Sequence, residues 1–170
     1  MVFFGKIVHF IVNIVYLALI VYAFICGPML AKYKPVVVLS SSMEPTFKIG
    51  SILYYKSCEM KDINVGDLIT FNLDGNLVSH RVVDIGDGYF TTKGDANETA
   101  DPKDVKYVDV YGKVSKYYLP YLGYYANVVN NNLILSIIIS VIVLVLEFVL
   151  GILEKIKNKK KENESSEANA

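Results

Sequence analysis

Two long apolar segments near the ends of the chain constrain its fold more than any other feature. Residues 7–29 contain no charged side chain, and residues 133–153 contain only Glu147. Each segment is long enough to cross a hydrocarbon core of about 30 Å as a helix. A hydrophobic content of 53% is also too high for an ordinary soluble domain. We therefore predict transmembrane helices over residues 7–30 and 132–153.

The charges beside these segments predict their orientation. The second segment is followed directly by five lysines: Lys155, Lys157, Lys159, Lys160 and Lys161. The positive-inside rule places that end in the cytoplasm, and two crossings put both termini on one side. We expect a cytoplasmic N-terminus over residues 1–6, an extracytoplasmic domain over residues 31–131, and a cytoplasmic charged tail over residues 154–170, disordered from residue 155. The first segment lacks a small-x-small cleavage site, so we expect an uncleaved anchor.

Charge and cysteine content argue against several other classes of protein. The formal net charge is 0 at pH 7, so nucleic acid is not an expected partner. Cys26 lies in the first apolar segment and Cys58 in the central region, so we expect no disulfide framework. No cluster of histidine, cysteine and acidic residues has the spacing of metal ligands, and we expect neither a metal nor another cofactor.

The central region has the pattern of an antiparallel β domain. Asp74 and Gly75 form a strong hairpin signal, and residues 93–104 have the composition of a loop. We therefore predict a mainly β extracytoplasmic domain, built as an antiparallel coiled sheet or barrel, flanked by the two transmembrane α-helices. Runs of β-branched and aromatic residues predict strands at residues 36–39, 51–55, 68–72, 77–85, 89–92 and 105–114.

Two further features belong to the second apolar segment. Tyr121, Tyr124 and Tyr125 directly precede it, and we expect them in the headgroup layer, with membrane lipid as a partner. Glu147 lies inside it. Its carboxylate could reach the interface, pair with a lysine, or meet a polar group of a partner subunit.

A serine stands where a predicted strand must stop. Ser42 closes the run of three serines that follows the apolar residues 36–39, and Pro45 comes soon after it. Proline cannot continue a regular strand or helix, so the Ser42 hydroxyl is expected at a strand-to-turn corner. A serine-rich stretch before a proline is also a common turn signal, and the local chemistry alone favours that interpretation.

A serine becomes a good nucleophile only when a base removes its proton. His9 lies in the first apolar segment, which leaves His80 as the only histidine that can serve an extracytoplasmic serine. Because side chains alternate along a strand, we expect His80 on the same face as Val78 and Val82. A purely structural histidine is the alternative.

Successive motifs of the central region resemble the motif boxes of type I signal peptidases, a family of serine peptidases. They are SSSMEPTF at residues 40–47, VSHRVV at residues 78–83, KGDANETAD at residues 93–101, and GKV with PYLG at residues 112–114 and 120–123. The bacterial branch of this family uses a Ser-Lys dyad. The histidine at position 80 and the KGD loop are similar to the archaeal and endoplasmic-reticulum branch, which has a Ser-His-Asp site.

This resemblance implies a role for each site residue. Ser42 is then the nucleophile, His80 the general base, and Asp101 the acid that orients and stabilises the imidazolium. Asp95 holds the loop together or shares that role, so both acids remain candidates. The backbone N–H of Ser42 and, as a weaker candidate, the hydroxyl of Ser40 would form the oxyanion hole.

Ala96 stands where many members of the family have asparagine, so a side-chain hydrogen bond from this position is not expected.

Lys93 is the other conceivable general base for Ser42. We disfavour it, because the resemblance places Lys93 in a structural loop and its ammonium would need burial to lose a proton.

The expected activity is that of a membrane-bound serine endopeptidase. It would cleave signal peptides from exported preproteins at the outer membrane surface, with the substrate added as a strand and Val36, Val38 and Val78 near its small side chains. Association with the secretion machinery and a specialised substrate set both stay open. A non-catalytic, membrane-anchored β domain that binds peptides is the alternative from another class.

Overall fold

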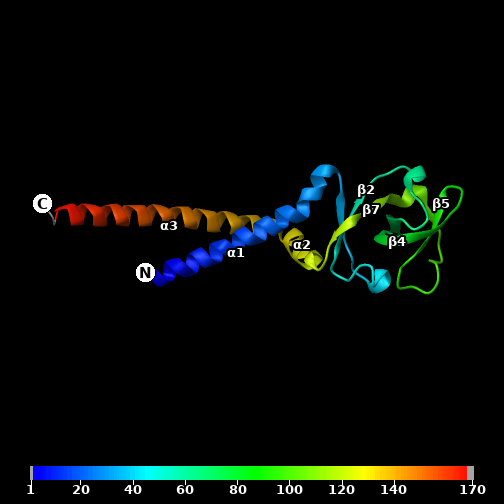
Figure 1. Cartoon of the computed structure of the whole chain (residues 1–170), viewed down its shortest axis with the longest axis horizontal. Helices are drawn as coiled ribbons and strands as arrows, with labels where there is room; N and C mark the ends of the chain where they lie inside the picture. Colours follow the sequence, from blue (N-terminus) through cyan, green and yellow to red (C-terminus); the bar gives the residue numbers. More distant parts are fainter. Residues whose placement is uncertain (1, 168–170) are drawn as a thin grey trace. The chain divides into compact units, whose positions relative to one another are not determined.

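The computed structural model describes residues 2–167 of the chain. The chain divides into two compact units, one formed by Phe24–Val128 and the other by the chain on either side of it. Figure 1 shows the sheet within Phe24–Val128, and the second unit consists mainly of the long helices α1 (Val2–Cys26) and α3 (Leu133–Glu167). A shorter helix, α2 (Leu122–Asn131), precedes α3 in the chain.

Two helical segments are long and apolar enough to cross a membrane, Lys6–Ala31 and Leu133–Lys160. Residues 133–153 of the second are almost entirely apolar, and most of their large side chains are exposed, as expected of a helix that faces lipid rather than water. Glu147 of α3 accepts a hydrogen bond from the hydroxyl of Tyr16 in α1. The sequence left open the interface, a lysine and a polar group of a partner subunit for Glu147, and this contact with Tyr16 of the same chain is none of these.

The charged end of the chain is helical where the sequence predicts disorder. Helix α3 continues to Glu167, so the prediction is wrong for the described part of residues 155–170, while residues 168–170 lie outside the described residues. Lysine and glutamate are good helix formers, and the apolar segment has already nucleated the helix. Each added residue therefore extends an existing helix at low cost.

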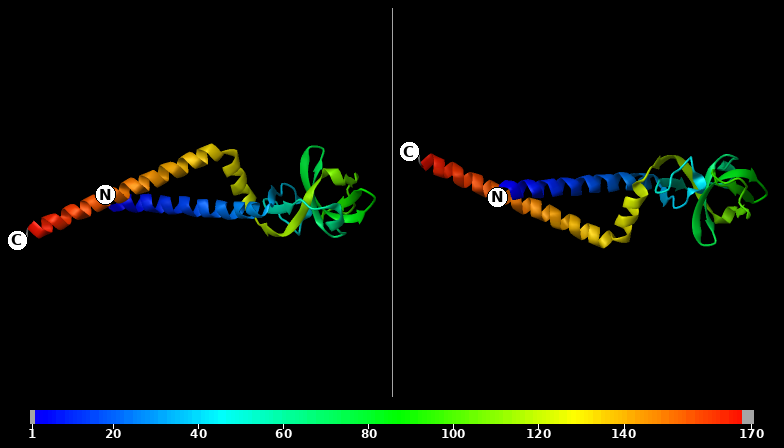
Figure 2. Two further views of the ribbon diagram at one scale, coloured as in Figure 1. Left: turned by 90° about the horizontal axis from the view of Figure 1, so that it is seen from above. Right: turned by 90° about the horizontal axis from the view of Figure 1, so that it is seen from below.

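The compact unit Phe24–Val128 contains one 7-stranded sheet in the order β1-β2-β7-β3-β4-β5-β6. Its pairings are antiparallel, which confirms the predicted antiparallel β domain. Within the described residues, no pairing joins the end strands β1 and β6. Figure 2 shows the twist of the longer strands. The strands are β1 (Lys34–Val37), β2 (Ile52–Lys56), β3 (Leu68–Leu73), β4 (Asn76–Ile85), β5 (Tyr89–Lys93), β6 (Val105–Lys106) and β7 (Val110–Leu119).

One predicted strand is two strands in the structure. A 3-10 turn, Tyr107–Asp109, divides the run expected at residues 105–114 into β6 and the start of β7. The two parts have different partners, because β6 pairs with β5 whereas β7 pairs with β2 and β3. The turn allows the chain to pass from one edge of the sheet to its middle.

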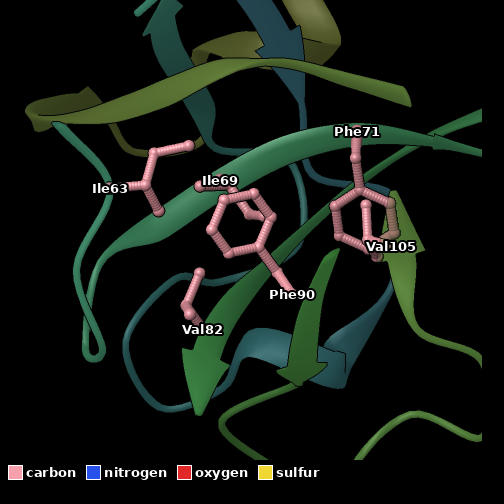
Figure 3. Close-up of a cluster of buried hydrophobic side chains, with 6 residues drawn as sticks. All are labelled: Ile63, Ile69, Phe71, Val82, Phe90 and Val105. Atoms are coloured by element: carbon pink, nitrogen blue, oxygen red, sulfur yellow. The ribbon is translucent and has the colours of Figure 1, made fainter. Parts of the chain in front are cut away.

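Strands β3 and β4 form a hairpin that contributes residues to the hydrophobic core and positions His80. Its tight turn at Asp74 and Gly75 has positive φ at both residues, 50° and 87°, as a two-residue hairpin turn of this type requires. In this register His80 lies opposite Ile69. The largest group of buried apolar side chains is shown in Figure 3: Ile63, Ile69, Phe71, Val82, Phe90 and Val105.

A second buried cluster lies under the serine turn. It consists of Met43, Phe47, Leu53, Tyr55 and Val114. Met43, which directly follows Ser42, is 2% exposed. Burial of this side chain anchors the turn to the sheet.

Candidate active site

Ser42 lies in a short turn between β1 and β2. The 3-10 turn Ser41–Met43 follows the extended residue Ser40, and a cis peptide bond joins Glu44 to Pro45. Ser42 is half-buried and its neighbour Met43 is buried, so the hydroxyl is accessible from a turn that is otherwise fixed.

His80 lies on β4 at the edge of the apolar core. It is 8% exposed, and Val82 on the same face is fully buried. The imidazole packs against the Phe71 ring in a T-shaped arrangement, with ring centroids 6.2 Å apart. Strand pairing and ring packing together hold the imidazole in one orientation.

The imidazole of His80 joins a serine to a carboxylate. Its Nε2 lies 3.1 Å from the Ser42 Oγ, and its Nδ1 lies 2.6 Å from the Asp101 Oδ2. A carboxylate can only accept a hydrogen bond, so Nδ1 carries the proton. In the neutral ring, Nε2 is then the acceptor for the Ser42 hydroxyl. This is the tautomer that a general base requires.

The two candidate acids of the KGD loop, Asp95 and Asp101, have different partners. Asp101 contacts His80, whereas Asp95 forms a bidentate ion pair with Arg81, at 2.8 Å to Nε and 2.7 Å to Nη2. Asp95 also accepts a hydrogen bond from the hydroxyl of Thr46. The hydrogen bonds from Arg81 hold the pKa of Asp95 below its usual value, against the opposing effect of burial.

Backbone contacts bring this loop against the serine turn. The N–H of Ala96 donates to the Ser42 carbonyl oxygen at 2.9 Å. At Gly94, an added Cβ would lie 2.6 Å from the same oxygen. Only glycine allows this close approach without a shift of the backbone.

A cavity of about 300 Å³ opens beside the serine. Ser40 contributes to its wall, with its Oγ 3.1 Å from the Ser42 Oγ. Lys93 lies elsewhere, because its Nζ donates to the Glu98 carbonyl oxygen at 3.3 Å. The lining residues that sequence reasoning singled out are Val36, Val38, Ser40, Ser42, Val78 and His80.

Sequence reasoning missed four residues that support the site: Arg81, Thr46, Gly94 and Thr92. Thr46, Arg81 and Gly94 lie inside the quoted motifs, but sequence reasoning assigned roles only to their neighbours. Thr92 donates to the Asp101 Oδ2 at 2.7 Å, and its burial follows from strand alternation. In the described part of the chain, no group of three or more histidine, cysteine or acidic residues could hold a metal ion.

The ion pair between Arg81 and Asp95 predicts a pH-dependent contribution to stability. An ordinary aspartate titrates near pH 3.9, and Asp95 titrates below its usual value in the folded protein. The stabilisation is therefore complete above about pH 4 and is lost as the pH falls through the lowered folded value. We expect Arg81→Gln to lower the melting temperature at pH 7 and to have a smaller effect at pH 3.

Lys103→Gln is the matched control for this measurement. Lys103 pairs with Asp74, but the two side chains are 66% and 75% exposed, so the pair contributes little. Equal losses for the two variants at pH 7 would contradict the assignment of Arg81 and Asp95 as a structural pair.

The sequence is similar to those of known signal peptidases. The family model described as "Signal peptidase, peptidase S26" matches residues 6–108. Signal peptidase I W of Bacillus subtilis (strain 168) is 44% identical over 89 residues, which cover 49% of this chain and 47% of the relative. The human signal peptidase complex catalytic subunit SEC11C is 34% identical over 110 residues, covering 56% and 57%.

The chain thus spans about half the length of these relatives. A third, the catalytic subunit SEC11 of Lodderomyces elongisporus, is 35% identical over 111 residues, which cover 57% of this chain and 66% of the relative. The matched region contains the serine turn, His80 and both candidate acids, Asp95 and Asp101. Because the family model covers more than half of the chain, this chain belongs to the signal peptidase family, peptidase S26.

Proposed function

We propose that the chain is a membrane-bound serine endopeptidase that cleaves signal peptides from exported preproteins. The observation that carries this proposal is the hydrogen-bonded series from Ser42 through His80 to Asp101 beside an apolar cavity. Membership of the signal peptidase family supports the same reaction and the same substrate class.

In the proposed reaction, His80 Nε2 takes the proton from the Ser42 hydroxyl as Oγ attacks the scissile carbonyl carbon. The imidazolium that forms is stabilised by the Asp101 carboxylate. His80 then gives its proton to the leaving amine, which leaves an acyl group on Ser42. Water, deprotonated by His80, attacks this ester, and His80 returns the proton to the Ser42 Oγ as the acyl product leaves.

The negative charge on the tetrahedral intermediate needs hydrogen-bond donors. The backbone N–H of Ser42 and the hydroxyl of Ser40 are the proposed donors. The 3.1 Å distance between the two Oγ atoms supports the second assignment, because it brings the Ser40 hydroxyl close to the reacting atom.

The cavity supports binding of an extended peptide with small side chains. β1 forms one wall and is the end strand of the sheet, so a substrate can add to it as a further strand. Val36, Val38 and Val78 supply apolar surface close to Ser42. Main-chain hydrogen bonds would then provide affinity, and limited space would select small residues before the cleaved bond.

The two candidate spans support a membrane location. We propose that both termini are cytoplasmic and that the sheet is extracytoplasmic, because lysines gather beyond the second span. Ser42 lies eleven residues after Ala31, the end of the first candidate span. Fully extended, this stretch reaches at most about 40 Å, so the serine would work close to the membrane surface.

Lipid and other proteins are proposed partners. Tyr121 and Tyr124, which lie 12 and 9 residues before the second span, are 57% and 60% exposed and would contact lipid headgroups. The human relative is named as the catalytic subunit of a signal peptidase complex. By analogy, an association with components of the secretion machinery is part of this proposal.

Substitution of the proposed nucleophile and base tests the activity. We expect Ser42→Ala and His80→Ala to reduce cleavage of a preprotein with an Ala-x-Ala site by at least about 10³-fold, because each removes a member of a unit that acts together. Cleavage is measured with the detergent-solubilised chain, and mass spectrometry identifies the new N-terminus.

Ser41→Ala is the control for this comparison. Ser41 is the exposed neighbour in the same turn, so its loss removes a hydroxyl without removing the nucleophile. Cleavage by Ser42→Ala at the wild-type rate would eliminate Ser42 as the nucleophile, and no cleavage above background by the unsubstituted chain would favour the peptide-binding alternative.

The rate of cleavage is expected to fall as the pH is lowered. Protonation of His80 removes the lone pair on Nε2 that accepts the Ser42 proton. Initial rates are measured from neutral to acidic pH, and circular dichroism checks that the protein stays folded. A rate that stays constant down to about pH 4.5 would argue against a histidine base.

Thiol labelling tests the proposed topology. In a variant with Cys26 and Cys58 replaced by alanine, Val108→Cys should react with a membrane-impermeant maleimide in intact cells, since Val108 is 85% exposed. Lys157→Cys should react only after the membrane is permeabilised. The reverse pattern would invert the assigned orientation.

A further inference from the structure

A buried threonine lies behind the proposed triad acid. Thr92 on β5 is 0% exposed, and its Oγ1 lies 2.7 Å from the Asp101 Oδ2. The same carboxylate oxygen lies 2.6 Å from His80 Nδ1. We propose that Thr92 is a positioning residue that holds the Asp101 carboxylate in the orientation needed to align His80, an inference that rests on the proposed peptidase function.

The direction of the hydrogen bond follows from the chemistry of the two groups. A carboxylate can only accept, so the threonine hydroxyl donates. A second hydrogen bond connects the same two residues, from the Asp101 N–H to the Thr92 carbonyl oxygen at 2.8 Å. Thr92 therefore restrains both the backbone and the side chain of Asp101.

This restraint matters because Asp101 lies in a loop. The residues between β5 and β6 have no strand pairing of their own, so the sheet does not fix the direction of the Asp101 side chain. Rotation of the carboxyl group would carry Oδ2 away from His80 Nδ1. The Thr92 hydroxyl opposes that rotation at the oxygen that contacts His80.

Thr92 itself is held firmly. Phe90 and Thr92 are the buried positions of β5, and Phe90 belongs to the core shown in Figure 3. Thr92 is paired with Val82, two residues along β4 from His80. Because threonine is branched at Cβ, its side chain has few rotamers available. The hydroxyl thus has a fixed position relative to the strand that carries the base.

The position of Thr92 predicts which kinetic constant depends on it. Among the described residues, those that line the cavity come from β1 to β4 and the serine turn, and none comes from β5. Removal of the hydroxyl should therefore leave substrate binding unchanged and impair the chemical step. A residue that served only to stabilise the fold would not give this separation.

The main test is Thr92→Val in the full-length chain, assayed in detergent on a preprotein with an Ala-x-Ala site. We expect kcat to fall by about tenfold or more, as for loss of a hydrogen bond to a charged group, and KM to change by less than about twofold. Thr92→Ser should recover most of the activity, whereas Thr92→Ala should not. Thr92→Ser and Thr92→Ala differ only in the hydroxyl, so a comparison of their kcat values tests the role of the hydroxyl even if Thr92→Val impairs folding.

Thr91→Val is the matched control. Thr91 is the preceding residue of the same strand and also donates to an aspartate, with its Oγ1 2.8 Å from the Asp104 Oδ1. Asp104 is a surface residue outside the proposed triad, so this variant should keep the wild-type kcat.

Three outcomes would overturn the inference: a wild-type kcat in Thr92→Val, equal losses in Thr92→Ser and Thr92→Ala, or an equal loss in Thr91→Val. A failure of the proposed function gives a different result. In that case the wild-type chain would cleave no faster than Ser42→Ala, and the inference about Thr92 would fall with it.

Discussion

The candidate site depends on close contact between two loops that the sheet does not connect directly. One loop carries Ser42 and the other carries Asp101. The backbone hydrogen bond from Ala96 to the Ser42 carbonyl oxygen joins them, and the absence of a side chain at Gly94 leaves room for it. Strand pairing fixes only His80, which lies between the two loops. The distance from the proposed nucleophile to the proposed acid is therefore set by loop packing, and the sheet supplies the proposed base.

Two neighbouring residues of β4 contact the two candidate acids, Asp101 and Asp95. His80 and Arg81 are consecutive on β4, so their side chains point to opposite faces. His80 on the buried side contacts Asp101, and Arg81 on the other side holds Asp95. A permanent cation next to Asp95 keeps that carboxylate ionised and engaged. Among the described residues, Asp101 forms no ion pair with a lysine or arginine, and its Oδ2 contacts both an imidazole and a hydroxyl. The alternation of side chains along a single strand thus separates a structural carboxylate from one available to the proposed general base.

The sequence predicted those features that depend on local pattern. Alternation and the Asp74–Gly75 turn indicated the hairpin that carries His80, and the motifs indicated the family, which the comparisons confirm. The residue pattern alone could not choose between Asp95 and Asp101, because both lie in a loop without periodicity and their directions depend on distant partners, and only the family resemblance favoured Asp101. Alternation along β5 predicts that the Thr92 side chain points into the core, but it does not predict that the hydroxyl contacts Asp101. The helical tail shows a different limit, since composition suggested disorder where an existing helix continues to Glu167.

Ala96 stands where many members of the family have asparagine, and its contacts show why this position of the KGD loop tolerates different side chains. This position contributes its backbone N–H to the Ser42 carbonyl oxygen, and its side chain is exposed. The contact therefore places no demand on side-chain type, although proline, which lacks the N–H, could not make it. Gly94, two residues earlier, is constrained for the opposite reason, because any Cβ there would meet the same oxygen. Whether a position in this loop can vary thus depends on whether its contact uses a backbone donor or the space left by a missing side chain.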